Sequence, residues 1–195
     1  MQPQLQPATK QPHLRGKQSK VDNQEMIVIM AGLPGTGKST LAQALAEATS
    51  GVVLNKDDIR STLFAPNEIE YSTEQDDFCL KVMLESAAYL FRKDLQRMIF
   101  IDGRPFSKTQ QLQQVLDAAE ELKQGWKILE CVYSPDAARK RLQEQNETHP
   151  AANRNYELYL KMKANWQEIV LPKTIIDTNQ DLSSCIKQAL QVLCC

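Results

Sequence analysis

Residues 26–48 read MIVIMAGLPGTGKSTLAQALAEA, and this stretch of the sequence decides the fold. Its first six residues form a continuous apolar run without alternation, which is typical of a strand buried on both faces of a parallel sheet. The glycine-rich segment 32–37 predicts a turn. The residues from Lys38 onward are strong helix formers, with Leu41 and Leu45 on one stripe. The order of strand, turn and helix predicts the first unit of an α/β fold.

The turn carries a complete phosphate-loop motif, because residues 32–39 fit G-x-x-x-x-G-K-[ST] at every fixed position. Glycines let the backbone aim its N–H groups at phosphate oxygens, the lysine adds charge for the β- and γ-phosphates, and the serine hydroxyl can bind Mg²⁺. The following helix directs its positive end at the anion. A connecting turn without a ligand is the alternative, and the strand–turn–helix context argues against it. The residues expected to bind the nucleotide are Gly32, Leu33, Pro34, Gly35, Thr36, Gly37, Lys38, Ser39 and Thr40.

Strands and helices alternate along the rest of the chain. Further strands are predicted at 52–54, 98–101, 126–133 and 173–176, and further helices at 73–96, 108–123, 135–145, 153–169 and 182–193. Such alternation indicates a parallel sheet with right-handed crossovers and helices on both faces. No internal repeat and no dividing linker is evident, so residues 25–195 are expected to form one domain.

Charged side chains follow the second predicted strand. Ligands of a parallel sheet bind outside the carboxyl ends of its strands, so Asp57, Asp58 and Arg60 are expected beside the phosphate loop. Phosphoryl transfer needs a carboxylate to accept the proton of a hydroxyl and cations to hold the migrating charge. Asp57 can be the carboxylate that accepts the proton, and Arg60 can be one of the cations. The alternative, acids favoured by a helix dipole, suits Asp58 better.

The same segment, residues 55–58, also fits N-K-x-D, the guanine-reading motif of GTPases. In GTPases that motif lies at the end of a late strand, whereas here it follows the second. No D-x-x-G follows the third strand either, because Asp102 precedes Gly103, Arg104 and Pro105. We therefore exclude a GTPase and expect the nucleotide to be ATP.

The third strand is apolar and ends at a carboxylate, the pattern MIFID at 98–102. An acid in that place can hold Mg²⁺ directly or through water, so Asp102 and Ser39 are the candidate metal ligands. Asp102 could instead only cap the turn. Arg104 would project into the same crevice and is a weaker candidate.

A phosphate loop followed by D-D-x-R after the second strand resembles the polynucleotide 5′-hydroxyl kinases and related small kinases, which include zeta-toxin-like, chloramphenicol-phosphotransferase-like and gluconate-kinase-like proteins. The resemblance covers residues 25–195, and its motifs specify the superfamily rather than the substrate. It implies a five-stranded parallel sheet of order 2-3-1-4-5 and a helical lid at about 136–158. It also implies that Asp57 is the general base and that Arg60 binds the acceptor side.

Basic residues border the expected lid. In adenylate-kinase-like folds, lid arginines close over the phosphates, exclude water and stabilise charge in the transition state. The candidates are Arg139 and Arg141, followed by Arg154. We assign Arg139 to nucleotide binding and Arg141 to catalysis, with an exposed helical hairpin as the alternative. His149, which precedes Pro150, is expected in a turn.

Composition limits the remaining function classes. The chain has 195 residues, 42% of them hydrophobic, which suffices for one sizeable core. Its net charge of −1 gives no reason to expect strong binding to duplex nucleic acid or anionic membranes. Residues 1–24 are rich in Gln, Pro and Lys, and we expect a disordered tail there. No apolar run reaches the ~20 residues that span a bilayer.

The cysteine and histidine content argues against a zinc site and for a reducing compartment. The chain has five cysteines, no CxxC pair and two histidines. An odd cysteine count without an apolar leader fits the cytoplasm, which is the expected location.

Together these features predict an ATP- and Mg²⁺-dependent kinase acting on a hydroxyl. The rivals are an ATP-hydrolysing switch or binding module without a phosphoryl acceptor, and a degenerate nucleotide-binding subunit. A small-molecule acceptor is favoured over a polynucleotide 5′-end, which would need a basic groove. Residues 61–93 are expected to form part of the acceptor pocket, where Tyr71, Asp76 and Phe78 lie without assigned roles. No membrane and no stable protein partner is expected.

Overall fold

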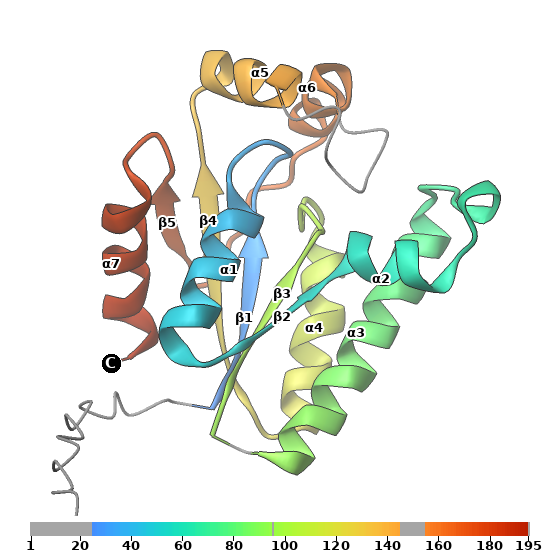
Figure 1. The fold of residues 1–195 in the computed structure, drawn as a ribbon, viewed down its shortest axis with the longest axis vertical. Coiled ribbons are helices and arrows are strands. Elements are labelled where there is room, and N and C mark those ends of the chain that lie inside the picture. Colours follow the sequence, from blue (N-terminus) through green and yellow to red (C-terminus); the bar gives the residue numbers. More distant parts are fainter. Residues whose placement is uncertain (1–24, 95, 145–154, 195) are drawn as a thin grey trace, which may run out of the picture.

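The computed structural model describes residues 25–94, 96–144 and 155–194. Five strands form one parallel sheet in the order β2-β3-β1-β4-β5 (Figure 1). They are β1 (Met26–Ala31), β2 (Val52–Asn55), β3 (Met98–Asp102), β4 (Gly125–Val132) and β5 (Thr174–Asp177). The predicted fold class and strand order are thereby confirmed. The expected tail at 1–24 lies outside the described residues, as do residues 145–154 of the expected lid, with His149 and Arg154.

Helices cover both faces of the sheet. Two of them, α1 (Lys38–Thr49) and α7 (Leu182–Leu193), pack on one face, while α3 (Thr73–Lys93) and α4 (Thr109–Glu121) pack on the other (Figure 1). Successive residues of β1 serve the two cores, since Val28 faces α1 and α7 whereas Ile27 faces α3 and α4. Because both faces are buried, the whole strand is apolar, as the sequence indicated.

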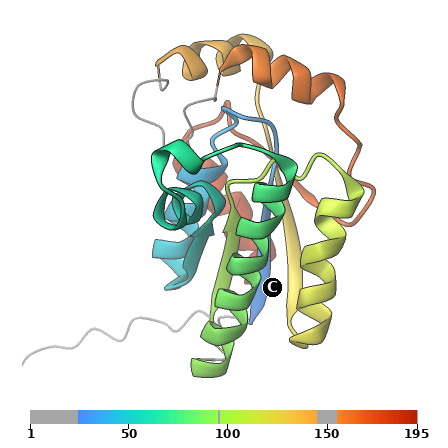
Figure 2. The same ribbon diagram turned by 90° about the vertical axis from the view of Figure 1, so that its right-hand side faces the viewer.

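Three further helices lie near the carboxyl ends of the strands. They are α2 (Lys56–Leu63), which begins directly after β2, and the pair α5 (Pro135–Glu144) and α6 (Tyr156–Ala164). Figure 2 shows α5 and α6 passing above the strand ends. Asn55 and Asp102 are register partners in β2 and β3, so the polar ends of these two strands lie at the same level. None of the helices in the described ranges is long and apolar enough to cross a bilayer.

The predicted helix at 153–169 is wrong in its last five residues. The helix α6 ends at Ala164, and the chain continues as an extended strap toward β5. Ile169 in this segment is buried in the core between the sheet and helices α3 and α4, and Trp166 packs against the same core. The backbone N–H of Gln167 donates to the carbonyl oxygen of Ser107 at 3.0 Å. Tertiary packing on the sheet therefore overrides the local helical pattern.

Candidate active site

The phosphate loop keeps its shape because glycines stand where other residues would be strained. The φ angles of Gly32, Gly35 and Gly37 are 136°, 81° and 80°, in a region that L side chains rarely adopt. A Cβ on Gly32 would also lie 2.3 Å from the carbonyl oxygen of Cys131 in β4. Helix α1 begins directly after Gly37 and has no acidic residue in its first turn, so its positive end is left for an anion.

The side chain of Lys38 folds back over this loop. Its Nζ donates to the carbonyl oxygen of Leu33 at 2.9 Å, and the residue is 8% exposed. Thr178, after β5, braces the loop by donating its hydroxyl to the carbonyl oxygen of Thr36 at 2.7 Å. Ser39 is exposed beside Lys38, and Thr40 is exposed in the same turn. A lysine held by a carbonyl can exchange that contact for phosphate oxygens.

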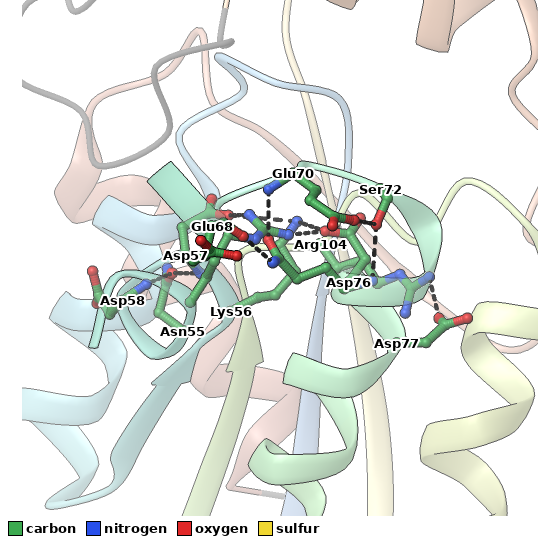
Figure 3. Close-up of polar contacts among 12 residues, drawn as sticks. Asn55, Lys56, Asp57, Asp58, Glu68, Glu70, Ser72, Asp76, Asp77 and Arg104 are labelled. Carbon is green, nitrogen blue, oxygen red and sulfur yellow. Dashed lines mark hydrogen bonds and ion pairs between the residues drawn. The ribbon is translucent and has the colours of Figure 1, made fainter. Parts of the chain in front are cut away.

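A network of ion pairs lies at the start of α2 (Figure 3). Arg60 is 2% exposed, and its Nη1 donates to Asp57 Oδ1 at 2.7 Å. Its Nη2 contacts Asp76 Oδ1, which also pairs with Lys56 Nζ at 2.8 Å. Tyr71 lies under the guanidinium, 5.1 Å from ring centroid to Cζ of Arg60. Two carboxylates thus balance two buried cations, and Asp57 is held in a fixed orientation.

Asn55 links this network to the end of β3. Its Oδ1 accepts from the backbone N–H groups of Asp57 and Asp58, at 2.8 and 3.3 Å, and so caps α2. Its Nδ2 donates to Asp102 Oδ2 at 2.7 Å. Asp102 is fully buried, and its Oδ1 has no hydrogen-bond partner among the described residues. A buried carboxylate oxygen left open in this way suits a cation, because such atoms are otherwise paired.

The residues present fit Mg²⁺, which stays a prediction from the sequence. Mg²⁺ is commonly bound through one or two protein oxygens together with substrate phosphates and water. The described residues contain no group of three or more His, Cys, Asp and Glu side chains that could hold a metal by themselves. Asp102 and Ser39 therefore remain the predicted ligands, completed by nucleotide phosphates.

One cavity joins the loop to the ion-pair network. It measures about 140 Å³ and is lined by Lys38 and Ser39 on one side and by Asp57 and Arg60 on the other. Arg104, after β3, forms another part of the wall. A nucleotide phosphate on the loop and a second molecule beside Asp57 would share this space.

The arginines of α5 lie apart from the cavity. Arg141 rests on the Tyr133 ring, 3.8 Å from Cζ to the ring centroid, and its Nη2 donates to the Thr178 carbonyl oxygen at 3.2 Å. A Cβ on Gly37 would lie 3.1 Å from Arg141 Nη1, so this guanidinium adjoins the phosphate loop. Arg139 is exposed and lies over Tyr156 of α6. Neither lines the cavity described above.

The sequence analysis assigned no function to three residues of this network. Asn55 and Lys56 entered the sequence argument only through the excluded guanine motif, and Asp76 had no assigned function. Asn55 could have been recognised, since Asn before a helix is a common cap. Asp76 reaches the site from α3, twenty residues after Lys56, and no local pattern announces that contact.

The thiol beneath the phosphate loop is inert. Burial raises the pKa of Cys131 to about 12 from its ordinary value of 9.0. Burial also raises the pKa of Cys79 in α3. These groups stay protonated at neutral pH, so the site offers carboxylates and hydroxyls rather than a thiolate nucleophile.

A family model described as an AAA domain matches residues 27–169. A search of curated proteins gives no match. Among solved structures, a kinase candidate from Chloroflexus aurantiacus J-10-fl aligns with a TM-score of 0.66 at 18% identity, covering 87% of this chain and 98% of that chain. A gluconokinase from Sinorhizobium meliloti 1021 aligns with a TM-score of 0.63 at 16% identity, covering 88% of this chain and 92% of that chain. The Mycobacterium tuberculosis APS kinase CysC, in complex with AMPPNP and APS, aligns with a TM-score of 0.60 at 13% identity, covering 87% of this chain and 98% of that chain. At these identities the likeness establishes a shared fold.

Proposed function

Because the chain belongs to the AAA-domain family, we propose that it is an ATP-dependent kinase that transfers the γ-phosphoryl group of Mg-ATP to a hydroxyl of a small molecule. One observation carries the proposal, namely that a single cavity is lined by Lys38 of the phosphate loop and by the carboxylate of Asp57. The two groups that bind a phosphoryl donor and activate a hydroxyl acceptor thus face the same space. Kinases among the solved structures with this fold support the same proposal.

The donor half is built by the loop and α1. Lys38 leaves the Leu33 carbonyl oxygen and pairs with the β- and γ-phosphates, while the loop amides and the helix terminus bind their oxygens. Ser39 and Asp102 would hold Mg²⁺, which neutralises charge on the transferring phosphoryl group. Arg141, which adjoins Gly37, is the arginine of α5 nearest this half. Its catalytic role, and nucleotide binding by Arg139, remain predictions.

The acceptor half is built by α2. Asp57 accepts the proton of the acceptor hydroxyl as the oxygen attacks the γ-phosphorus, and the bond to the ADP oxygen breaks. Asp57 Oδ1 lies 2.7 Å from Arg60 Nη1 and 3.4 Å from Lys56 Nζ, so Oδ2 is the oxygen left for that proton. Arg60, itself fixed by Asp76 and Tyr71, keeps the carboxylate in place. Holding the γ-phosphate and the acceptor hydroxyl close together in this geometry lowers the activation barrier further.

The lining of the cavity favours a small acceptor. Leu158 and Met162 of α6 close one side with apolar atoms. A polynucleotide end would need an open, basic groove leading to Asp57, and the net charge of −1 does not favour one.

Acceptor-dependent ADP release tests the proposal, with Asp57→Asn as the key variant. Its matched control is Asp58→Asn, the same change on the next residue, which is exposed and does not line the cavity. We expect Asp57→Asn to lower the acceptor-dependent rate by about 10²–10⁴-fold, as removal of a general base does, and Asp58→Asn to change it little. ATP turnover that ignores every acceptor and survives Asp57→Asn would contradict the proposal and favour a hydrolytic switch.

A further inference from the structure

Arg104 is a buried arginine whose hydrogen-bonding capacity is largely unused. It follows β3, is 1% exposed and lines the cavity that holds Asp57. Its Nη2 pairs with Asp77 Oδ1 of α3 at 2.7 Å (Figure 3). Its Nε and Nη1 are buried without a hydrogen-bond partner among the described residues. A guanidinium has five N–H donors, so most of them are open here.

Such an arrangement is costly unless a ligand completes it. Buried polar groups are nearly always hydrogen-bonded, and a buried charge with an incomplete partner is penalised by desolvation. Asp77 compensates only in part, because its Oδ1 lies at ion-pair distance from Nη2 but has no hydrogen-bond partner among the described residues. Arg60, the other buried arginine of the cavity, differs, because both its terminal nitrogens pair with carboxylates and only its Nε is left without a hydrogen-bond partner among the described residues.

The charges around the cavity leave Arg104 in excess. Four cationic and two anionic side chains line it: Lys38, Lys56, Arg60, Arg104, Asp57 and Asp76. The two carboxylates balance Lys56 and Arg60 through the ion pairs already described. Lys38 belongs to the phosphate loop and the donor. Of the three cations outside the phosphate loop, Arg104 is the one whose carboxylate partner lies outside the lining, because Asp77 does not line the cavity.

We propose that Arg104 binds an anionic group of the acceptor, so that the substrate is a small hydroxyl compound carrying a carboxylate, phosphate or sulfate. This inference rests on the proposed function, since it describes the molecule that Asp57 deprotonates. The planar fork of an arginine suits a two-oxygen contact with such a group. Neutral sugars and neutral nucleosides would leave the open donors of Arg104 buried and unpaired, so they are poor substrates.

Anion binding to the nucleotide-loaded protein tests the inference without any turnover. The full chain is saturated with Mg²⁺ and AMPPNP, which fills the phosphate loop, and is titrated with sulfate and with acetate by calorimetry, against sodium chloride of equal ionic strength. We expect at least one of the two anions to bind, and Arg104→Gln to weaken that binding by about 10- to 100-fold, the range for a hydrogen bond to a charged group. Arg92→Gln removes the same charge from the last turn of α3 and should leave binding unchanged.

Two milder variants keep the test decisive if Arg104→Gln folds poorly. Asp77→Asn removes the competing carboxylate but keeps Arg104, so it should bind the anion several-fold more tightly. Arg104→Lys keeps the charge but loses the fork, so it should bind the anion less tightly than the wild type. Absence of binding to the wild type, or equal binding by all these variants, would overturn the inference. If the anion binds as expected but Asp57-dependent transfer is missing, the proposed function fails while the anion site stands.

Discussion

Asp76 should stabilise the fold through the two buried cations that share its Oδ1. Lys56 Nζ lies 2.8 Å from this oxygen, Arg60 Nη2 contacts it, and the side chains of both cations are at least 90% buried. Removing one partner of a buried ion pair costs about 3–5 kcal/mol. Asp76 is 23% exposed, and Asp57 still contacts both cations, so we expect Asp76→Ala to lower the free energy of unfolding by about 2–3 kcal/mol.

Urea unfolding followed by circular dichroism measures this change, provided that the slope with denaturant stays constant. Glu74→Ala is the control, because Glu74 is an exposed acid in the same first turn of α3 and loses only the helix-dipole contribution of about 0.3–1 kcal/mol. Adding Arg60→Met to Asp76→Ala should recover part of the loss, since it removes the uncompensated charge. A difference below about 0.5 kcal/mol between the two alanine variants would refute the reasoning, because that is the range of ordinary surface substitutions.

Three further perturbations follow from the same geometry. Asn55→Ala removes the cap of α2 and the hydrogen-bond donor to Asp102, so we expect urea unfolding to show a free energy of unfolding lower by about 2–3 kcal/mol. A loss below about 0.5 kcal/mol would mean that neither contact forms. Gly32→Ala should lower the melting temperature by several degrees, because the φ angle of Gly32 is 136° and a Cβ there would lie 2.3 Å from a backbone oxygen. Gly125→Ala is the control and should leave the melting temperature nearly unchanged, because a Cβ there meets no atom closer than 3.5 Å. Stability should fall above pH 9, by up to about 1.4 kcal/mol per pH unit for Cys131, because the unfolded thiol ionises near 9.0 while the folded one stays protonated to about 12. Cys131→Ala should flatten that decline in pH-dependent urea unfolding, and an unchanged slope would contradict it.

Much of the fold could be predicted because its signals are local. The apolar run of β1 and the glycine-rich loop lie next to each other in the sequence, and alternating strands and helices allow few topologies. The end of α6 could not be predicted from the sequence, because the helical pattern continues past Ala164. The chain leaves the helix there because Ile169 packs in the core of the protein.

The site also contains residues that the sequence could predict and residues that it could not. Lys38, Asp57 and Arg60 were predicted at one site and line one cavity, because motif residues after parallel strands meet at one edge of the sheet. The partners that fix them come from elsewhere in the chain, as Asp76 does from α3. The expected lid arginines were placed by resemblance, and the side-chain contacts of Arg141 with Tyr133 and Thr178 follow only from the packed structure.

The fate of the γ-phosphoryl group tests the central claim most directly. ³¹P NMR of ATP and Mg²⁺ with a panel of small hydroxyl compounds, neutral and anionic, distinguishes a new phosphoester from inorganic phosphate. We expect a phosphoester with an anionic acceptor, abolished by Lys38→Ala and lowered by at least about 100-fold in Asp57→Asn. Inorganic phosphate as the product with every compound, formed at an unchanged rate in Asp57→Asn, would contradict the account and identify an ATP-hydrolysing protein instead.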